Sequence, residues 1–179
     1  VPLDLPTSIN VFRDHGLGAD WDWSGSNLIA YDAKGSDGYY DIHMANPDGS
    51  GDVNLTTNDT SLPEKHICSP FWHPSGNWIL FVAEKATHPG SSTDALPGFG
   101  AYCDIWLINK QGTKTYKLVD IPNDYSHGVI GPHFSHDGKQ IVWTDRKTQP
   151  NLLNPLEQAG FWTIKIADFC FNPADSIPI

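Results

Sequence analysis

The sequence predicts an all-β domain built from three repeated sheet modules, and three observations support this prediction. A phrase made of an aromatic residue, a polar turn with Gly and a short apolar run occurs three times, at residues 23–31, 72–81 and 134–143. A second strand-like phrase follows each of them, at residues 41–46, 104–109 and 163–168. Aromatic residues make up 12% of the chain, which is typical of strand-rich packing. Units of this length that recur along a chain indicate a propeller or a solenoid.

Each module is expected to hold four antiparallel strands, of which the second and third are the most clearly marked. Apolar residues alternate with polar or small ones in three pairs of segments, 28–31 with 40–45, 78–82 with 104–108, and 140–144 with 161–167. The turns before these pairs, at 24–27, 74–77 and 136–139, contain Gly, which tolerates positive φ. Fourth strands are expected to end at 53–56 and at 116–119.

Aligning the modules on their leading aromatic residue equates Trp23 with Trp72 and Phe134, and leaves the first module one turn residue short. The predicted organisation is a single domain, residues 1–179, with a lead-in strand at 1–18. The modules are expected at about residues 19–57, 67–120 and 129–179. Within the connection 146–160, the order Asn-Pro-Leu-Glu at 154–157 predicts the start of a short helix.

Charge and composition exclude several classes of function. The chain has 11 Lys plus Arg and 21 Asp plus Glu, a formal net charge of −10 that repels nucleic acid, so no nucleic-acid partner is expected. No apolar run approaches the roughly 18 residues of a membrane helix, so no membrane insertion is expected. The three cysteines, Cys68, Cys103 and Cys170, lack C-x-x-C spacing, which favours reduced thiols, with one disulfide as the alternative.

Two stretches resemble the TolB-like family of propeller repeats. They are SHDGKQIVW (135–143) and DIHMANPDGSG (41–51), the latter followed by NLT (54–56). The resemblance covers roughly residues 20–170 and implies a β-propeller of four-stranded antiparallel blades, about three of which are present. Thr163 replaces the Asp found at Asp41 and Asp104, so the third blade departs from the pattern. Since three blades cannot close a ring, we expect a partial propeller that belongs to a longer protein or pairs with another copy.

Histidines precede the expected innermost strand of every module, at His15, His66 and His127. In a propeller these segments emerge on the same face as the long connections, and that face usually binds ligands. If the three imidazoles converge, they form a divalent metal site or a pH-sensitive polar site. Ordinary loop histidines are the alternative, because the eight His of the chain are scattered.

The expected binding surface also includes His88, in the long connection 85–101, and Trp21, the earliest tryptophan on its strand. His133, on the third innermost strand, is a looser candidate. Related propellers in some lyases that act on acidic polysaccharides hold a metal with histidines, and here only the histidines match. No nucleophile elbow, zinc-protease helix or phosphate-binding Gly loop is present.

The sequence therefore predicts a non-catalytic protein-binding or scaffold propeller, with other proteins or further blades as partners. The family resemblance and the acidic composition imply an extracytoplasmic place, periplasmic or secreted. One alternative is a metal-assisted polysaccharide lyase or hydrolase with His15, His66 and His127 as ligands of a divalent ion. Another is a self-assembling structural subunit, a homo-oligomer joined through uncovered blade edges.

Overall fold

Short alternating segments separated by glycine turns form antiparallel strands throughout the part of the chain that the structure describes. The computed structural model describes residues 11–88, 95–97, 99–124, 126–147, 161–172 and 177–178. The predicted helix start at 154–157 and most of the lead-in strand at 1–18 lie outside these residues.

The strands form three successive antiparallel sheets, called blades 1, 2 and 3 below. Blade 1 has the order β1 (Ala19–Trp21), β2 (Ile29–Lys34), β3 (Tyr40–Ala45) and β4 (Val53–Asn54). Blade 2 has the order β5 (Ile67–Trp72), β6 (Trp78–Glu84), β7 (Cys103–Asn109) and β8 (Thr115–Val119). Blade 3 contains β9 (His127–Phe134), β10 (Gln140–Lys147) and β11 (Phe161–Asp168). A separate two-stranded sheet pairs β12 (Phe171–Asn172) with β13 (Ile177–Pro178).

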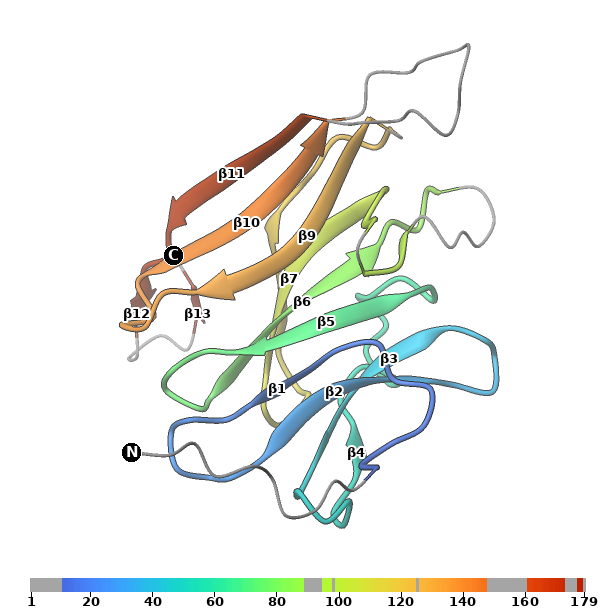
Figure 1. Ribbon diagram of the computed structural model, residues 1–179, viewed down its shortest axis with the longest axis vertical. Helices are drawn as coiled ribbons and strands as arrows, with labels where there is room; N and C mark the ends of the chain where they lie inside the picture. Colours follow the sequence, from blue (N-terminus) through green and yellow to red (C-terminus); the bar gives the residue numbers. More distant parts are fainter. Residues whose placement is uncertain are drawn as a thin grey trace, which may run out of the picture.

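The three blades lie face to face in chain order, from the blue and cyan strands of blade 1 to the orange and red strands of blade 3 (Figure 1). The sheets do not close into a ring. This arrangement confirms the predicted fold class, an all-β incomplete propeller of antiparallel blades. Blades 1 and 2 have four strands each, and the described part of blade 3 has three.

Ladder registers identify the equivalent residues of each blade and correct one sequence alignment. Trp21 pairs with Ile29 at the place where Trp72 pairs with Ile79 and Phe134 with Ile141, so Trp21 is the leading aromatic of blade 1. The alignment on Trp23 is therefore wrong by two residues. The physical reason is the length of the first turn: residues 22–28 of blade 1 form a turn that is one residue longer than residues 73–78 of blade 2, whereas the sequence alignment made it one residue shorter.

That longer turn is built around a buried carboxylate. Asp22 accepts a hydrogen bond from the backbone N–H of Ser24 at 2.8 Å and another from the hydroxyl of Ser26. Asn27 has a φ of 59°, a left-handed conformation that Asn tolerates better than most residues. Trp23 is left on the outside of the turn, away from the strand.

The core lies between the blades. Between blades 1 and 2 it includes Ile42, Leu55, Ile67, Ile79 and Phe81, and between blades 2 and 3 it includes Ile105, Leu107, Val129, Ile141 and Trp143. Blade 2 thus buries one face against blade 1 and the other against blade 3, as stacked repeats do.

A buried aspartate ties the lead-in segment and the first two blades together. Asp32 accepts hydrogen bonds from the backbone N–H groups of Leu17 at 2.6 Å, Gly18 at 2.9 Å and Ser69 at 3.0 Å. Burial raises the pKa of Asp32, and the three N–H groups partly offset that rise. The innermost strands β1 and β5 are held side by side by this residue.

The cysteines are free thiols, with Cys68 and Cys103 buried on β5 and β7. Those strands are separated by β6. Burial raises the pKa of both thiols well above the ordinary value, so neither is a reactive thiolate at neutral pH.

Candidate functional site

The innermost strands carry three equivalent residues that face one hollow. Asp20 on β1, Phe71 on β5 and His133 on β9 each stand one position before the leading aromatic residue. All three line the same hollow. The rings of Phe71 and His133 are 3.7 Å apart between centroids, and Asp20 Oδ2 accepts the Trp72 backbone N–H at 2.7 Å.

This inner-strand hollow has a volume of about 680 Å³ and lies where the first strand of each blade turns into the second. Its lining comes from all three blades: Asp20, Trp23, Phe71, Trp72, His73, Pro74, His133, Phe134, Ser135 and His136. Five of these ten residues are Trp, Phe or Pro, and the other five are Asp, His or Ser. A concave surface that combines apolar rings with a set of polar groups is the usual form of a binding site.

His73 forms the buried part of the hollow and joins blades 2 and 3. Its Nε2 hydrogen-bonds the Gly138 carbonyl oxygen at 3.1 Å, while its Nδ1 accepts the Ser75 backbone N–H at 3.1 Å. This pattern requires a neutral imidazole with the proton on Nε2. The ring also packs on Phe134, with 4.8 Å between the centroids.

Turn glycines allow this close approach of neighbouring blades. A Cβ atom on Gly138 would lie 2.3 Å from His73 Nε2, and one on Gly76 would lie 1.9 Å from Ser24 Oγ. Both glycines also have positive φ, 71° and 66°, so a side chain is disfavoured for two reasons. The turns around the hollow therefore lie in close contact with one another.

The electrostatics of the hollow are set by one carboxylate. Burial lowers the pKa of His73, with the Gly138 hydrogen bond opposing, and burial lowers the pKa of His133, with the charge of Asp20 opposing. Both imidazoles are neutral at pH 7 as a result. Among the residues that the structure describes, the lining holds one acidic residue, Asp20, and no Lys or Arg.

Trp23 forms the exposed wall of the hollow. Its side chain is 83% exposed, whereas Trp21, which we expected to be the exposed tryptophan, is 38% exposed. An indole presented to solvent beside a concave surface is typical of an interaction site, because Trp offers a large contact area at low entropic cost.

The histidines expected to form a cluster are placed apart. His15 is exposed in the lead-in to β1 and has a positive φ of 64°. His66 is buried before β5, against the rings of Tyr39 and Tyr40, and burial lowers its pKa.

The remaining predicted residues have local partners of their own. His127 opens β9, where its Nδ1 lies 3.0 Å from Asp124 Oδ1. His88 is buried, stacked on Tyr102 at 4.0 Å and paired with Glu84. Within the described ranges, no three His, Cys, Asp or Glu side chains form a group able to hold a metal ion. The structure therefore does not join His15, His66 and His127 into a ligand set.

A second hollow, of about 670 Å³, lies at the other end of blades 1 and 2, beside His66. It is lined mainly by acidic and hydroxyl residues, including Asp41, Thr56 and Asp59. These groups already bond one another or nearby residues: Thr56 Oγ1 donates to Asp41 at 2.8 Å, and Asp59 accepts from the backbone N–H of Ser61 at 2.9 Å. Some of its polar groups are therefore already engaged within the protein.

Sequence reasoning missed Asp20, Phe71, His73 and His136 as site residues. A signal was present, because Phe71 and His133 both follow a Pro, in SPFW and GPHF. The misplaced alignment on Trp23 hid the fact that Asp20 occupies the same position in blade 1.

Comparison with solved structures supports the fold. A structure assigned as TolB from Agrobacterium tumefaciens matches with a TM-score of 0.58 at 17% identity, over 88% of this chain and 47% of that chain. This chain thus spans about half the length of that protein. At this identity the similarity shows the fold alone, a TolB-like β-propeller.

Two further structures match less well. They are the β-propeller domain of the trilobed protease from Pyrococcus furiosus (TM-score 0.44, 12% identity, 84% of this chain and 42% of that chain) and TolB from Acinetobacter baumannii (TM-score 0.35, 14% identity, 87% and 41%). No protein-family model and no curated protein sequence matches the chain. Among the described residues, no helix has the length and apolarity that a bilayer crossing requires.

Proposed function

We propose that this chain is a non-catalytic propeller module that binds a segment of another protein in the inner-strand hollow. The observation that carries this proposal is a concave surface shared by all three blades, with an exposed Trp23 as one wall. The TolB-like fold is compatible with such a role but does not by itself dictate it.

The lining favours binding over catalysis. Its rings offer contact area, and both nitrogens of its buried His73 are engaged, Nε2 with the Gly138 carbonyl oxygen of blade 3 and Nδ1 with Ser75 of the same turn, so this imidazole is not free for proton transfer. Neighbouring turns are in close contact at Gly76 and Gly138, and the His73–Gly138 hydrogen bond joins two of them, so we expect a preorganised surface, which reduces the entropic cost of binding.

Selection of peptides tests this proposal. A library of random displayed dodecapeptides is panned on the chain, and the affinity of the selected peptides is then measured for two variants. Each variant loses one exposed tryptophan. Trp23→Ser removes the wall of the hollow, while Trp162→Ser removes the 53% exposed indole of β11. We expect the first variant to weaken binding by about tenfold or more, because truncated aromatic anchors commonly cost that much.

The second variant is expected to bind like the wild type. Failure to enrich any peptide, or peptides that bind Trp23→Ser as well as the parent, would contradict the proposed site. Circular dichroism and thermal melting of both variants establish that each remains folded.

We also propose an extracytoplasmic location, periplasmic or secreted, supported by the resemblance to TolB-like repeats and by the acidic composition. Fractionation of the source cells, followed with an antibody against the chain, tests it. Recovery with a cytoplasmic marker enzyme would refute this location.

A further inference from the structure

We propose that the inner-strand hollow recognises a cationic side chain, the guanidinium of Arg or the ammonium of Lys, in the segment that it binds. Asp20 supplies the opposite charge and Trp23 the aromatic wall. This inference rests on the proposed function, since it names the chemistry of the ligand for the same hollow.

The first argument is that Asp20 lacks a cation of its own. Many carboxylates of the chain pair with Lys or Arg: Asp52, Glu84, Asp104, Asp120 and Asp145. Within the described part of the chain, no Lys or Arg lies within ion-pair distance of Asp20. A carboxylate that is half-buried and uncompensated in an aromatic hollow favours an incoming cation.

The second argument concerns the two oxygens of Asp20. Oδ2 accepts the Trp72 backbone N–H at 2.7 Å, which fixes the orientation of the carboxylate. Among the described residues Oδ1 has no hydrogen-bond donor, so it is available to a ligand. By contrast, buried Asp32 is occupied by three backbone N–H groups.

The third argument is the balance of charge around the site. The lining contains no Lys or Arg, and its buried imidazole, His73, is neutral because Nδ1 accepts a backbone N–H. The whole chain carries −10, so its long-range field attracts cations to the hollow and repels anions. An acidic ligand segment is disfavoured by both effects.

The fourth argument is the ring faces beside Asp20. A cation that approaches Oδ1 enters a hollow also lined by Trp23 and Phe71. Indole and phenyl faces attract cations, and the chain uses this contact elsewhere, with Arg146 Cζ 3.6 Å from the centre of the Phe99 ring. Carboxylate and rings together select a cation carried on an apolar stem, which is the structure of Arg and Lys.

A pair of small probes tests the inference. N-acetyl-argininamide and its neutral isostere N-acetyl-citrullinamide are titrated into the labelled chain, and the indole N–H signal of Trp23 is followed by NMR. We expect saturable shifts with the arginine probe and about tenfold weaker binding of the citrulline probe, because the charge-assisted contact is lost.

Two variants with the same change in net charge complete the experiment. Asp20→Asn keeps an oxygen for the Trp72 N–H, so the fold is retained, and should weaken the arginine probe about tenfold. Asp48→Asn alters an exposed turn residue outside the hollow and should leave affinity unchanged.

The outcomes separate this inference from the proposed function. Peptides that bind in a Trp23-dependent way but lack enriched Arg or Lys, and that bind Asp20→Asn unchanged, would overturn the inference and leave the binding module intact. Equal binding of the two probes would also overturn it. Absence of any Trp23-dependent peptide would instead remove the proposed function itself.

Discussion

The two ends of the stack of blades differ in how their outer faces are finished. At one end, the outer face of blade 1 is covered by the lead-in segment, in which Phe12 packs edge-on against Tyr31 at 5.1 Å. At the other end, the outer face of β11 presents apolar side chains to solvent: Trp162, Ile164 and Ile166.

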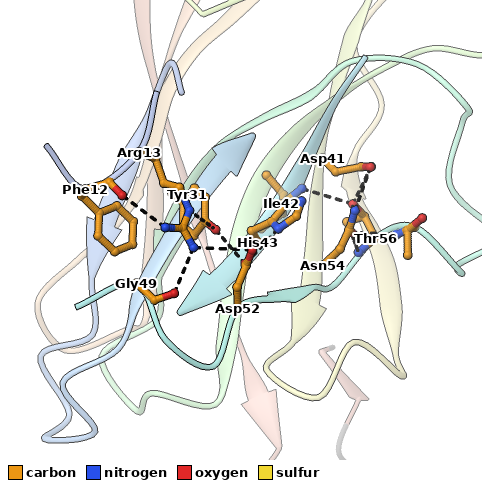
Figure 2. A network of polar contacts seen from close by, with 11 residues as sticks. Phe12, Arg13, Tyr31, Asp41, Ile42, His43, Gly49, Asp52, Asn54 and Thr56 are labelled. Carbon is orange, nitrogen blue, oxygen red and sulfur yellow. Dashed lines mark hydrogen bonds and ion pairs between the residues drawn. The ribbon is translucent and has the colours of Figure 1, made fainter. Parts of the chain in front are cut away.

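The covered face has polar residues where the interior blades have apolar ones. Tyr31 and His43 pair across β2 and β3 at the positions that Phe81 and Trp106 occupy in blade 2. Figure 2 shows how the polar groups are satisfied: the Tyr31 hydroxyl donates to Asp52 at 2.7 Å and accepts from Arg13 Nε at 3.1 Å.

Further bonds tie the same segment to the turn before β4. Arg13 Nη2 donates to the Gly49 carbonyl oxygen at 3.0 Å, and His43 Nδ1 lies 3.0 Å from Asp52. Tyr31, His43 and Asp52 therefore form a polar network under the lead-in segment. A polar network of this kind suits a face that is covered by a single segment rather than by the apolar face of another blade.

The uncovered face keeps the composition of an interior blade. By ladder register, Ile164 of β11 is equivalent to Ile105 of β7 and Ile42 of β3, which are fully buried under the next blade, while Ile164 is 71% exposed. The difference teaches that polar substitutions mark a finished face, whereas β11 keeps Trp162, Ile164 and Ile166 on its exposed face.

The largest expected effect on stability comes from replacing the equivalent residues Ile42, Ile105 and Ile164 by Ala, one blade at a time. Ile42→Ala and Ile105→Ala should each lower the free energy of unfolding by about 2–5 kcal/mol, because both leave a cavity in an inter-blade core. Ile164→Ala should change it by less than about 0.5 kcal/mol, since its side chain is mostly in water already.

Urea denaturation measures the three values. If a core variant does not fold, Ile42→Val and Ile105→Val provide milder changes of about 1 kcal/mol each. A loss at Ile164 as large as that at Ile105 would show that the face of β11 is covered in solution. Ile164→Lys would then also lower the mass measured by sedimentation if the cover is a second copy.

An intermediate effect is expected at the covered end. Tyr31→Phe keeps the ring on Phe12 but removes the hydroxyl that links Arg13 with Asp52, and should cost about 1 kcal/mol of unfolding free energy. Hydrogen exchange of the lead-in amides should rise in parallel. Tyr39→Phe removes a hydroxyl outside this network and serves as the control; equal losses in both variants would contradict the role of the network in covering this face.

The smallest expected effect is a pH dependence of the stability that Asp52 contributes under the lead-in segment. Partial burial raises the pKa of Asp52, but hydrogen bonds from Tyr31 and His43 and the charges of His43 and Arg13 outweigh it, so the net pKa lies below the ordinary 3.8. A carboxylate with a depressed pKa stabilises the fold above its unfolded pKa, and this contribution is lost as the pH falls through the folded value.

The stability difference between wild type and Asp52→Asn should therefore be present at pH 5 and shrink below about pH 4, with a size of about 0.5 kcal/mol for a partly exposed pair. Urea titrations at each pH measure it. A difference that does not shrink between pH 5 and about pH 3 would contradict the depressed pKa.

The central strands of the three blades follow from local patterns. Segment 40–45 was predicted and is β3, and 78–82, 104–108 and 140–144 lie within β6, β7 and β10. Alternation and glycine turns are local signals, so they are readable without knowing what each face will meet.

The candidate site was less predictable, because it depends on register. The extra residue in the first turn, stabilised by Asp22, shifted the apparent repeat and disguised the equivalence of Asp20 with Phe71 and His133. The hollow also combines residues of three blades, and their convergence follows from contacts such as His73 with Gly138, between residues far apart in sequence. Histidine spacing along the chain carried no such information.

The contacts of turn glycines with the preceding blade indicate what an additional blade would need in order to pack on this stack. Gly76 and Gly138 lie against turn residues of the preceding blade, Ser24 and His73, whereas the equivalent Gly25 of blade 1 has no atom within 4 Å of a Cβ built on it. A further blade added in front of blade 1 can place a turn residue against Gly25, provided that it displaces the lead-in segment. A module inserted elsewhere would need a glycine of its own at this position of the turn. Gly→Ala substitution should therefore destabilise the fold more at Gly76 and Gly138, which contact the preceding blade, than at Gly25, which has no such contact.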